Sequence, residues 1–171
     1  NRISDGVANR ILHWNRKTGD LQKLDIPWWF PQFQALPNFE YGTVDQQNRL
    51  WVPTRQGLLL ADGQSFICKF YRNNPLDRES LSEDFLNAVQ LDPIQPNRYL
   101  WIGTEDSGLN RFDMETEKSI HYREEDGLAN NTIYGILSDD RGDLWMSTNR
   151  GLTRAILNPE TREVAQFRTF N

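Results

Sequence analysis

The side chains that could carry out chemistry are mainly carboxylates. Glu124, Glu125 and Asp126 form one acidic run, and Glu105 and Asp106 form another. Glycoside hydrolysis needs two carboxyl groups held about 5–10 Å apart across a cleft, whereas adjacent acidic residues are typical of solvated loops. We therefore interpret both runs as loops and keep glycoside hydrolysis as an alternative.

The histidines and the cysteine have no partners at spacings typical of a metal site. His13 and His121 lie far apart without a His-x-x-x-His or Cys-x-x-Cys pattern, and Cys68 is the only cysteine. The sequence contains no P-loop, no dinucleotide-binding glycine pattern and no nucleophile elbow. It therefore predicts no catalytic residue, no metal and no cofactor in this segment.

Composition excludes several classes of partner. The chain has 171 residues and a net charge of −5, and its lysines and arginines are scattered. A basic patch for nucleic acid or an anionic membrane is therefore not expected, and no apolar run is long enough to span a bilayer. The first residue is Asn1 rather than Met, so we expect a piece excised from a longer protein.

One short stretch occurs three times and organises the chain. It reads LWVPTRQGLLL from Leu50, LWIGTEDSGLNRF from Leu100 and LWMSTNRGLTRA from Leu144. In each copy Thr stands three residues after the Trp, and Gly-Leu follows. Spacings of this size, about 40–50 residues, are typical of propeller blades. The repeated trios are Trp51, Thr54 and Gly57; Trp101, Thr104 and Gly108; and Trp145, Thr148 and Gly151.

Each full repeat has the pattern of four short strands joined by turns. The first strand ends in Asp, the second carries Leu-Trp, the third begins at Gly-Leu, and the fourth follows a polar turn. Apolar residues fall on both faces of the Leu-Trp strand, as in Leu144, Trp145 and Met146, so each sheet must be covered on both sides. Face-to-face packing of four-stranded sheets provides this cover.

We therefore predict an all-β fold, a β-propeller segment of about three and a half four-stranded antiparallel blades. Residues 1–171 form one domain, with a partial blade at 1–26 and blades at 36–71, 85–123 and 132–171. Trp51, Trp101 and Trp145 are the predicted structural core. Pro53 lies inside a Leu-Trp strand and predicts a bulge there. A closed four-bladed ring that lacks two strands is the alternative architecture.

Residues 73–154 resemble one known family. LWIGTEDSGLNRFD, preceded by NNPLDRESLSEDF and followed by DGLANNTIYGILSDDRGDLW, is similar to the two-component regulator propeller repeat. That resemblance implies a non-enzymatic, ligand-sensing propeller in the periplasm, the ectodomain of an inner-membrane receptor. The parent chain would then carry the remaining blades and a histidine kinase or diguanylate cyclase activity.

Two alternatives to sensing stay open. Ser138, Asp140, Gly142 and Trp145 fit the Asp-box pattern of sialidase-type propellers, so a propeller glycosidase or lyase is one alternative. An Asp-Gly hairpin turn explains the same residues without catalysis. A structural dimerisation platform is the other alternative, and exposed sheet faces at the ends of an arc predict self-association, including a homodimer.

Topology predicts where a ligand would bind. In antiparallel blades, the connections between blades lie at the same end as the turns between second and third strands. Exposed aromatic rings beside mixed charges suit a small-molecule or carbohydrate-like ligand. The predicted ligand-binding residues are Trp28, Trp29, Arg55, Gln56, Glu105, Asp106, Asn149 and Arg150.

Overall fold

The computed structural model describes residues 10–14, 21–25, 42–62 and 67–170. The chain divides into two compact units, Asn1–Asn38 and Phe39–Asn171. In the first unit, β1 (Arg10–Trp14) and β2 (Leu21–Asp25) pair antiparallel.

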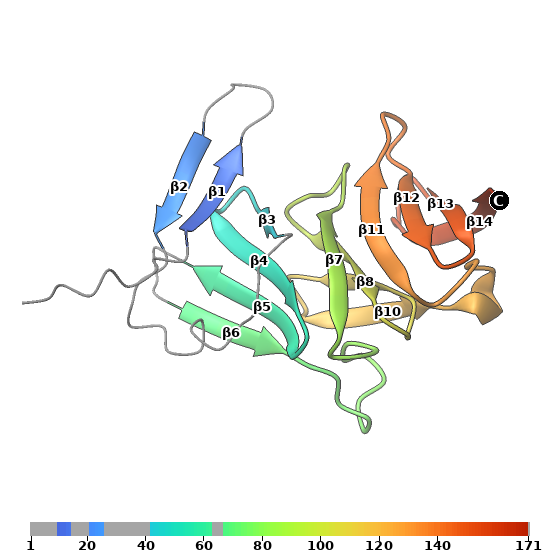
Figure 1. Cartoon of the computed structure of the whole chain (residues 1–171), viewed down its shortest axis with the longest axis horizontal. Helices are drawn as coiled ribbons and strands as arrows, with labels where there is room; N and C mark the ends of the chain where they lie inside the picture. Colours follow the sequence, from blue (N-terminus) through green and yellow to red (C-terminus); the bar gives the residue numbers. More distant parts are fainter. Residues whose placement is uncertain (1–9, 15–20, 26–41, 63–66, 171) are drawn as a thin grey trace, which may run out of the picture. The chain divides into compact units, whose positions relative to one another are not determined.

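The second unit contains three four-stranded antiparallel sheets in chain order (Figure 1). Each sheet pairs its strands consecutively, and this confirms the prediction of all-β, four-stranded, antiparallel blades. The strands are β3 (Thr43–Val44), β4 (Arg49–Thr54), β5 (Gly57–Asp62) and β6 (Ile67–Tyr71); β7 (Leu86–Leu91), β8 (Tyr99–Thr104), β9 (Leu109–Asp113) and β10 (Lys118–Tyr122); and β11 (Ile133–Ser138), β12 (Leu144–Thr148), β13 (Gly151–Leu157) and β14 (Val164–Phe170).

Helical structure is minimal. Within the described ranges of the second unit, one three-residue 3-10 helix, Glu124–Asp126, precedes β11. No helix in the described part of the chain is long and apolar enough to cross a membrane.

Apolar clusters hold neighbouring sheets together. All six residues of β8 are buried, because its two faces pack against different sheets. Trp51 of the first four-stranded sheet lies in a cluster with residues of the second sheet. Trp101 of the second sheet lies in another cluster with residues of the third sheet. The first cluster includes Leu86, Leu100, Ile102 and Phe112; the second includes Leu128, Ile133, Ile136, Leu144 and Met146.

The bulge expected at Pro53 is absent from the β4–β5 ladder, and the pairing on the other side of Pro53 lies outside the described residues. The β4–β5 register runs without a shift from Arg49 to Thr54, and Pro53 pairs with Leu58. The described β3–β4 pairing covers only Leu50 and Trp51 of β4, so Pro53, with no N–H to donate, lies beyond it. Register shifts occur instead in the first strands of the next two sheets, between Leu86 and Ala88 and between Ile133 and Gly135.

Antiparallel order gives every sheet two distinct ends. We call one the clamp end: it carries the turns between first and second strands and between third and fourth strands. The other is the loop end, which carries the turns between second and third strands and the connections 72–85 and 123–132. β7 and β11, the first strands of successive sheets, pack against each other (Figure 1).

Candidate functional site

Three aspartates organise the clamp end in the same way. Asp45, Asp92 and Asp139 each end a first strand, and each accepts a hydrogen bond through Oδ2 from the indole Nε1–H of the repeated tryptophan. The distances are 2.9 Å to Trp51, 2.8 Å to Trp101 and 3.0 Å to Trp145. Each Oδ1 accepts two backbone N–H groups of the following turn. One carboxylate therefore fixes both the turn and the tryptophan rotamer.

The repeated Thr and Gly close the turns at the loop end. The Oγ1–H of Thr104 donates to the carbonyl of Gly108 at 2.8 Å, and the same oxygen accepts the N–H of Ser107 at 2.9 Å. Gly108 has a φ of 81°, and a Cβ there would clash with the carbonyl oxygen of Tyr122. Only glycine fits this position without strain.

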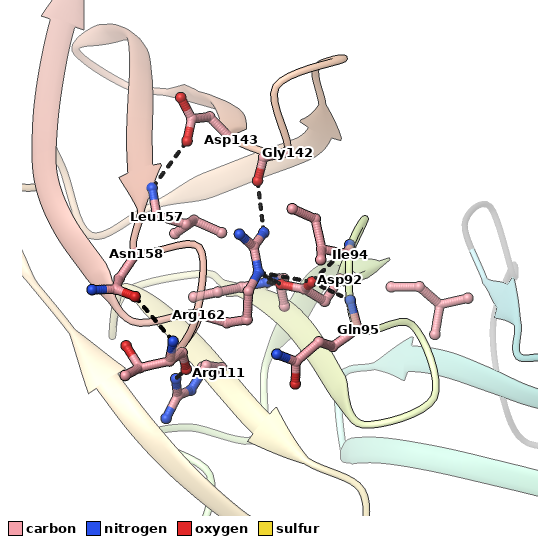
Figure 2. Close-up of polar contacts among 12 residues, drawn as sticks. Asp92, Ile94, Gln95, Arg111, Gly142, Asp143, Leu157, Asn158 and Arg162 are labelled. Carbon is pink, nitrogen blue, oxygen red and sulfur yellow. Dashed lines mark hydrogen bonds and ion pairs between the residues drawn. The ribbon is translucent and has the colours of Figure 1, made fainter.

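The aspartates at the clamp end differ in the cation that balances them. Asp45 pairs with Arg49 of its own sheet at 2.7 Å. Asp92 instead receives Arg162, from the turn between β13 and β14, through Nε at 2.9 and 3.0 Å (Figure 2). The side chains of Asp92 and Arg162 are 0% and 1% exposed. The second and third sheets are therefore joined by a buried ion pair.

Further contacts surround the Arg162–Asp92 pair. Arg162 donates through Nη2 to the carbonyl of Gly142 at 2.7 Å, and Arg111 of β9 donates to the carbonyl of Thr161 at 2.6 Å (Figure 2). The buried guanidinium thus has carboxylate and carbonyl acceptors, as a charge removed from water requires. This arrangement is structural, because it joins the second and third sheets at the clamp end.

At the loop end, equivalent positions carry different side chains. Asn87 of β7 donates to Glu105 at 2.8 Å, and at the corresponding place in the next sheet Tyr134 of β11 donates to Asn149 at 2.6 Å. Each pair joins a first strand to the residue that follows the repeated threonine. The pairs are solvent-exposed, so their polar atoms are available to a second partner.

The structure places six of the eight predicted ligand-binding residues at the loop end. Arg55, Gln56, Glu105, Asp106, Asn149 and Arg150 all lie in turns between second and third strands and are exposed. Trp28 and Trp29 lie outside the described residues. These residues remain a predicted site.

Charged and backbone groups add to the loop end. Arg150 forms an exposed ion pair with Glu124 at 3.1 Å, and the backbone N–H of Asp106 donates to Glu83 at 2.9 Å. These contacts tie each turn to the connection between sheets. The loop end therefore presents guanidinium, carboxylate and amide groups close to one another.

Sequence reasoning missed two exposed aromatic residues at the loop end. Phe85 is 49% exposed and Tyr134 is 52% exposed. Both lie at the start of a first strand, where the repeat has no fixed residue type. The available signal was the difference between repeats at one position: Asn87 in the second sheet corresponds to Tyr134 in the third.

His121, one of the groups weighed for metal binding or catalysis, contacts the backbone. His121 Nε2 lies 2.7 Å from the carbonyl oxygen of Ser80, which indicates a structural contact. Within residues 42–62 and 67–170 and the two N-terminal strands, no group of three His, Cys, Asp or Glu residues could hold a metal ion.

Hydrogen bonds lower the pKa of two carboxylates at the clamp end, Asp139 and Glu117. The indole hydrogen bond from Trp145 is the largest cause that lowers the pKa of Asp139 below its usual value. The hydrogen bond from Lys69 likewise lowers the pKa of Glu117. A raised carboxyl pKa, as a general acid requires, is therefore not found at either residue.

The family resemblance is confirmed by one match. Residues 127–150 match the family model described as "Two component regulator propeller". This segment contains a connection, β11, the Asp139 turn, β12 and the turn at Asn149, so it spans both ends of one blade. No curated protein matches the chain.

Similar solved structures share the fold. A protein described as the extracellular domain of a hybrid two component system, BT3049 from B. thetaiotaomicron, has a TM-score of 0.66 and 20% identity, covering 94% of this chain and 20% of that chain. The extracellular domain of a one component system, BT4673 from the same organism, has a TM-score of 0.58 and 20% identity, covering 74% and 18%. This chain thus spans about one fifth of the length of each.

An enzyme also has a similar fold. Virginiamycin B lyase from Staphylococcus aureus has a TM-score of 0.55 and 18% identity, covering 95% of this chain and 48% of that chain. At such identities these similarities define the propeller fold and say nothing of activity.

Proposed function

We propose that this chain is part of a non-enzymatic, ligand-sensing propeller of a bacterial signal-transduction receptor, and that its loop end contributes to the ligand site. The single observation that carries the proposal is the contrast between equivalent positions. The Asp–Trp contacts repeat in all three sheets, whereas Asn87–Glu105 is replaced by Tyr134–Asn149 in the next sheet. Positions whose side chains do not share one structural contact across the sheets are available to bind a ligand.

The family match supports a role in signal transduction. Residues 127–150 match the family model of the two-component regulator propeller, and two structures of similar fold are described as extracellular domains. By this proposal the chain works outside the cytoplasm, in the periplasm, together with the other blades of a larger propeller. A histidine kinase or diguanylate cyclase would supply the output.

The chemistry of the loop end favours a small polar ligand such as a carbohydrate. Amide and carboxylate groups of Asn87, Glu105 and Asn149 can form directional hydrogen bonds to hydroxyl groups. The exposed rings of Phe85 and Tyr134 offer apolar surfaces against which a sugar face can pack. Such a combination of a few directed polar groups with aromatic surface is typical of small-molecule sites.

The test is a glycan array followed by calorimetry with the strongest oligosaccharide on the array. Asn149→Ala and Arg150→Ala should each weaken binding about tenfold, since one well-used polar contact contributes about 1–2 kcal/mol. Arg141→Ala and Lys118→Ala are matched controls, because both residues are exposed and lie at the clamp end. Equal losses at the controls, absence of any binding, or cleavage of a bound glycan would contradict the proposal.

A further inference from the structure

The two connections at the loop end are attached differently to the sheets that they enter. Residues 72–85 lead into the second four-stranded sheet, and residues 123–132 lead into the third. Each connection buries one leucine, Leu81 at 1% and Leu128 at 3% exposure. Their apolar anchors are therefore equivalent, and the difference lies in their polar contacts.

Hydrogen bonds fix connection 72–85 along the second sheet. The N–H of Ser82 donates to Oδ1 of Asn110 in β9 at 2.9 Å, and Nδ2 of Asn110 donates to the Ser82 hydroxyl at 2.8 Å. Asn110 is 0% exposed. The backbone N–H of Ser119 in β10 also donates to the carbonyl of Glu79 at 2.7 Å. This connection is therefore held to both the third and the fourth strand of its sheet.

Connection 123–132 lacks these attachments to the third sheet. Ala129, which follows the buried leucine, is equivalent to Ser82, and it has no hydroxyl group. Thr153, two residues after the repeated glycine, is equivalent to Asn110. Thr153 is 0% exposed, and its Oγ1 has no hydrogen-bond partner among the described residues. Within the described ranges, no hydrogen bond joins this connection to β13 or β14.

An arginine in the turn between β12 and β13 makes the polar contact instead. Nη1 of Arg150 donates to Oε2 of Glu124 at 3.1 Å and to the carbonyl of Ala129 at 3.5 Å. The Arg150 and Glu124 side chains are 66% and 37% exposed. Water can replace an exposed ion pair of this kind at little cost. The polar attachment of this connection to the third sheet is therefore weak in the part of the chain that the structure describes.

Hydrogen bonds within residues 123–132 give the segment a shape of its own. Oε1 of Glu124 accepts Nδ2–H of Asn130 at 2.9 Å and the backbone N–H of Asn131 at 3.2 Å. The N–H of Glu124 donates to Oδ1 of Asn131 at 3.0 Å. These contacts do not depend on the third sheet, so the segment can move away from it as a unit.

The observed position of the segment leaves buried polar atoms unsatisfied. Besides Oγ1 of Thr153, Nε of Arg123 is buried without a partner among the described residues. A buried polar group without a hydrogen bond raises the free energy of this position. Because the equivalent Asn110 contacts its own connection directly, we expect opening of the segment to hydrate Thr153 as well as Arg123. Hydration of both groups offsets part of the cost of exposing Leu128.

We infer that residues 123–132 form a movable flap at the loop end, and that the Arg150–Glu124 ion pair is its latch. Residues 72–85 are the fixed counterpart. The flap itself requires no ligand. Its coupling to a ligand rests on the proposed function: a ligand that contacts both the 149–150 turn and the flap binds the closed position and holds the flap there.

Two equivalent backbone amides report the opening of the two connections. The N–H of Gly57 donates to the carbonyl of Asp84 at 2.8 Å, and the N–H of Gly108 donates to the carbonyl of Asn131 at 3.0 Å. Amide exchange of the ligand-free 171-residue chain, measured by NMR, should show about tenfold lower protection at Gly108 than at Gly57. This difference corresponds to the loss of about one hydrogen bond.

Substitutions separate the flap from general loosening of the fold. Arg150→Ala should lower protection at Gly108 about two- to fivefold with an unchanged urea midpoint. Ala129→Ser, which restores the hydroxyl present at Ser82, should raise protection at Gly108 about two- to tenfold. Lys118→Ala is the matched control, because it removes an exposed ion pair to Glu79 in the fixed connection, and protection at Gly57 should not change.

Three results would decide against these inferences. Equal protection at Gly57 and Gly108 that neither Arg150→Ala nor Ala129→Ser alters would overturn the flap, as would a fall in the urea midpoint that accounts for the whole change in Arg150→Ala. Binding of a glycan that leaves exchange at Gly108 unchanged would overturn the coupling and leave the flap standing. Absence of glycan binding would count against the proposed function, while the ligand-free measurements still test the flap.

Discussion

At the clamp end, three aspartates hold three tryptophans at 2.8–3.0 Å in the same geometry. At the loop end of the same strands, Asn87 and Glu105 in one sheet correspond to Tyr134 and Asn149 in the next. The two ends share one scaffold; the loop end repeats its Thr–Gly turn contact but not the side chains at these two positions. Comparison of repeats within one chain thus separates residues that build the blade from residues that are free to recognise a ligand.

Burial differs between the two ends in the same sense. The Asp92 and Arg162 side chains at the clamp end are 0% and 1% exposed, whereas Arg150 and Glu124 at the loop end are 66% and 37% exposed. An ion pair in water contributes about 0–1 kcal/mol, while a buried charge that loses its partner costs about 3–5 kcal/mol. Substitution of the buried pair at the clamp end should therefore lower stability, whereas substitution of the exposed pair at the loop end should mainly affect binding.

The largest expected effect is that of Arg162→Met. It leaves the buried Asp92 carboxylate without its cation, and the free energy of unfolding should fall by about 3–5 kcal/mol. Urea melts would measure this loss, with Arg162→Lys expected to retain part of it. Lys118→Met is the matched control, since its pair with Glu79 is more than half exposed. A loss at Arg162→Met no larger than the control's would contradict a structural role for the buried Arg162–Asp92 pair.

A smaller effect separates two equivalent tryptophans. Trp101→Phe removes a hydrogen bond to the buried Asp92 carboxylate, and a hydrogen bond to a charged group contributes about 1.5–3 kcal/mol. Trp145→Phe should cost less, because the Asp139 side chain is partly exposed and water can replace the indole donor. Chemical denaturation of both variants would check the order, and equal losses would refute it.

Asp139 should make stability against urea depend on pH. Its pKa is lowered in the folded state, chiefly by the Trp145 indole. Its contribution to stability is therefore fully present above the usual Asp pKa of about 4 and is lost as pH falls through the lower folded value. Asp139→Asn should reduce the difference between urea midpoints at pH 7 and pH 3. An unchanged difference would show that this carboxylate does not contribute.

The smallest expected change in stability is that of Arg150→Ala at the loop end. Its exposed ion pair with Glu124 contributes about 0–1 kcal/mol, so thermal melting should hardly shift. A loss as large as that of Arg162→Met would mean that the loop end is also structural, and that ligand binding there could not be separated from folding.

The sequence predicted the blades because the Trp, Thr and Gly positions are tied to hydrogen bonds that every sheet repeats. It could not predict that Arg162 would reach Asp92, 70 residues earlier. In the previous sheet the residue equivalent to Arg162 is Glu117, which pairs with Lys69 instead. The repeat therefore contains no sequence pattern that predicts the ion pair between the second and third sheets. The bulge expected at Pro53 does not occur in the β4–β5 ladder, and the first-strand side of Pro53 lies outside the described residues.

The candidate site was predictable only by topology. Alternating strands place Glu105, Asp106, Asn149 and Arg150 at one end, and that follows from the strand count alone. The partners of these residues do not follow, because Tyr134 reaches Asn149 across a register shift between Ile133 and Gly135. Side-chain pairing at the loop end depends on tertiary geometry that no spacing in the sequence encodes.

Hydrogen–deuterium exchange with and without the strongest oligosaccharide from the array tests the difference between the ends most directly. The account predicts that slower exchange on binding is confined to the loop end, in residues 83–87, 105–107, 124–134 and 149–150. Exchange in the clamp-end turns, residues 45–49, 92–98, 139–143 and 158–163, should be unchanged. Protection that appears in the clamp-end turns and is absent from the loop end would contradict it.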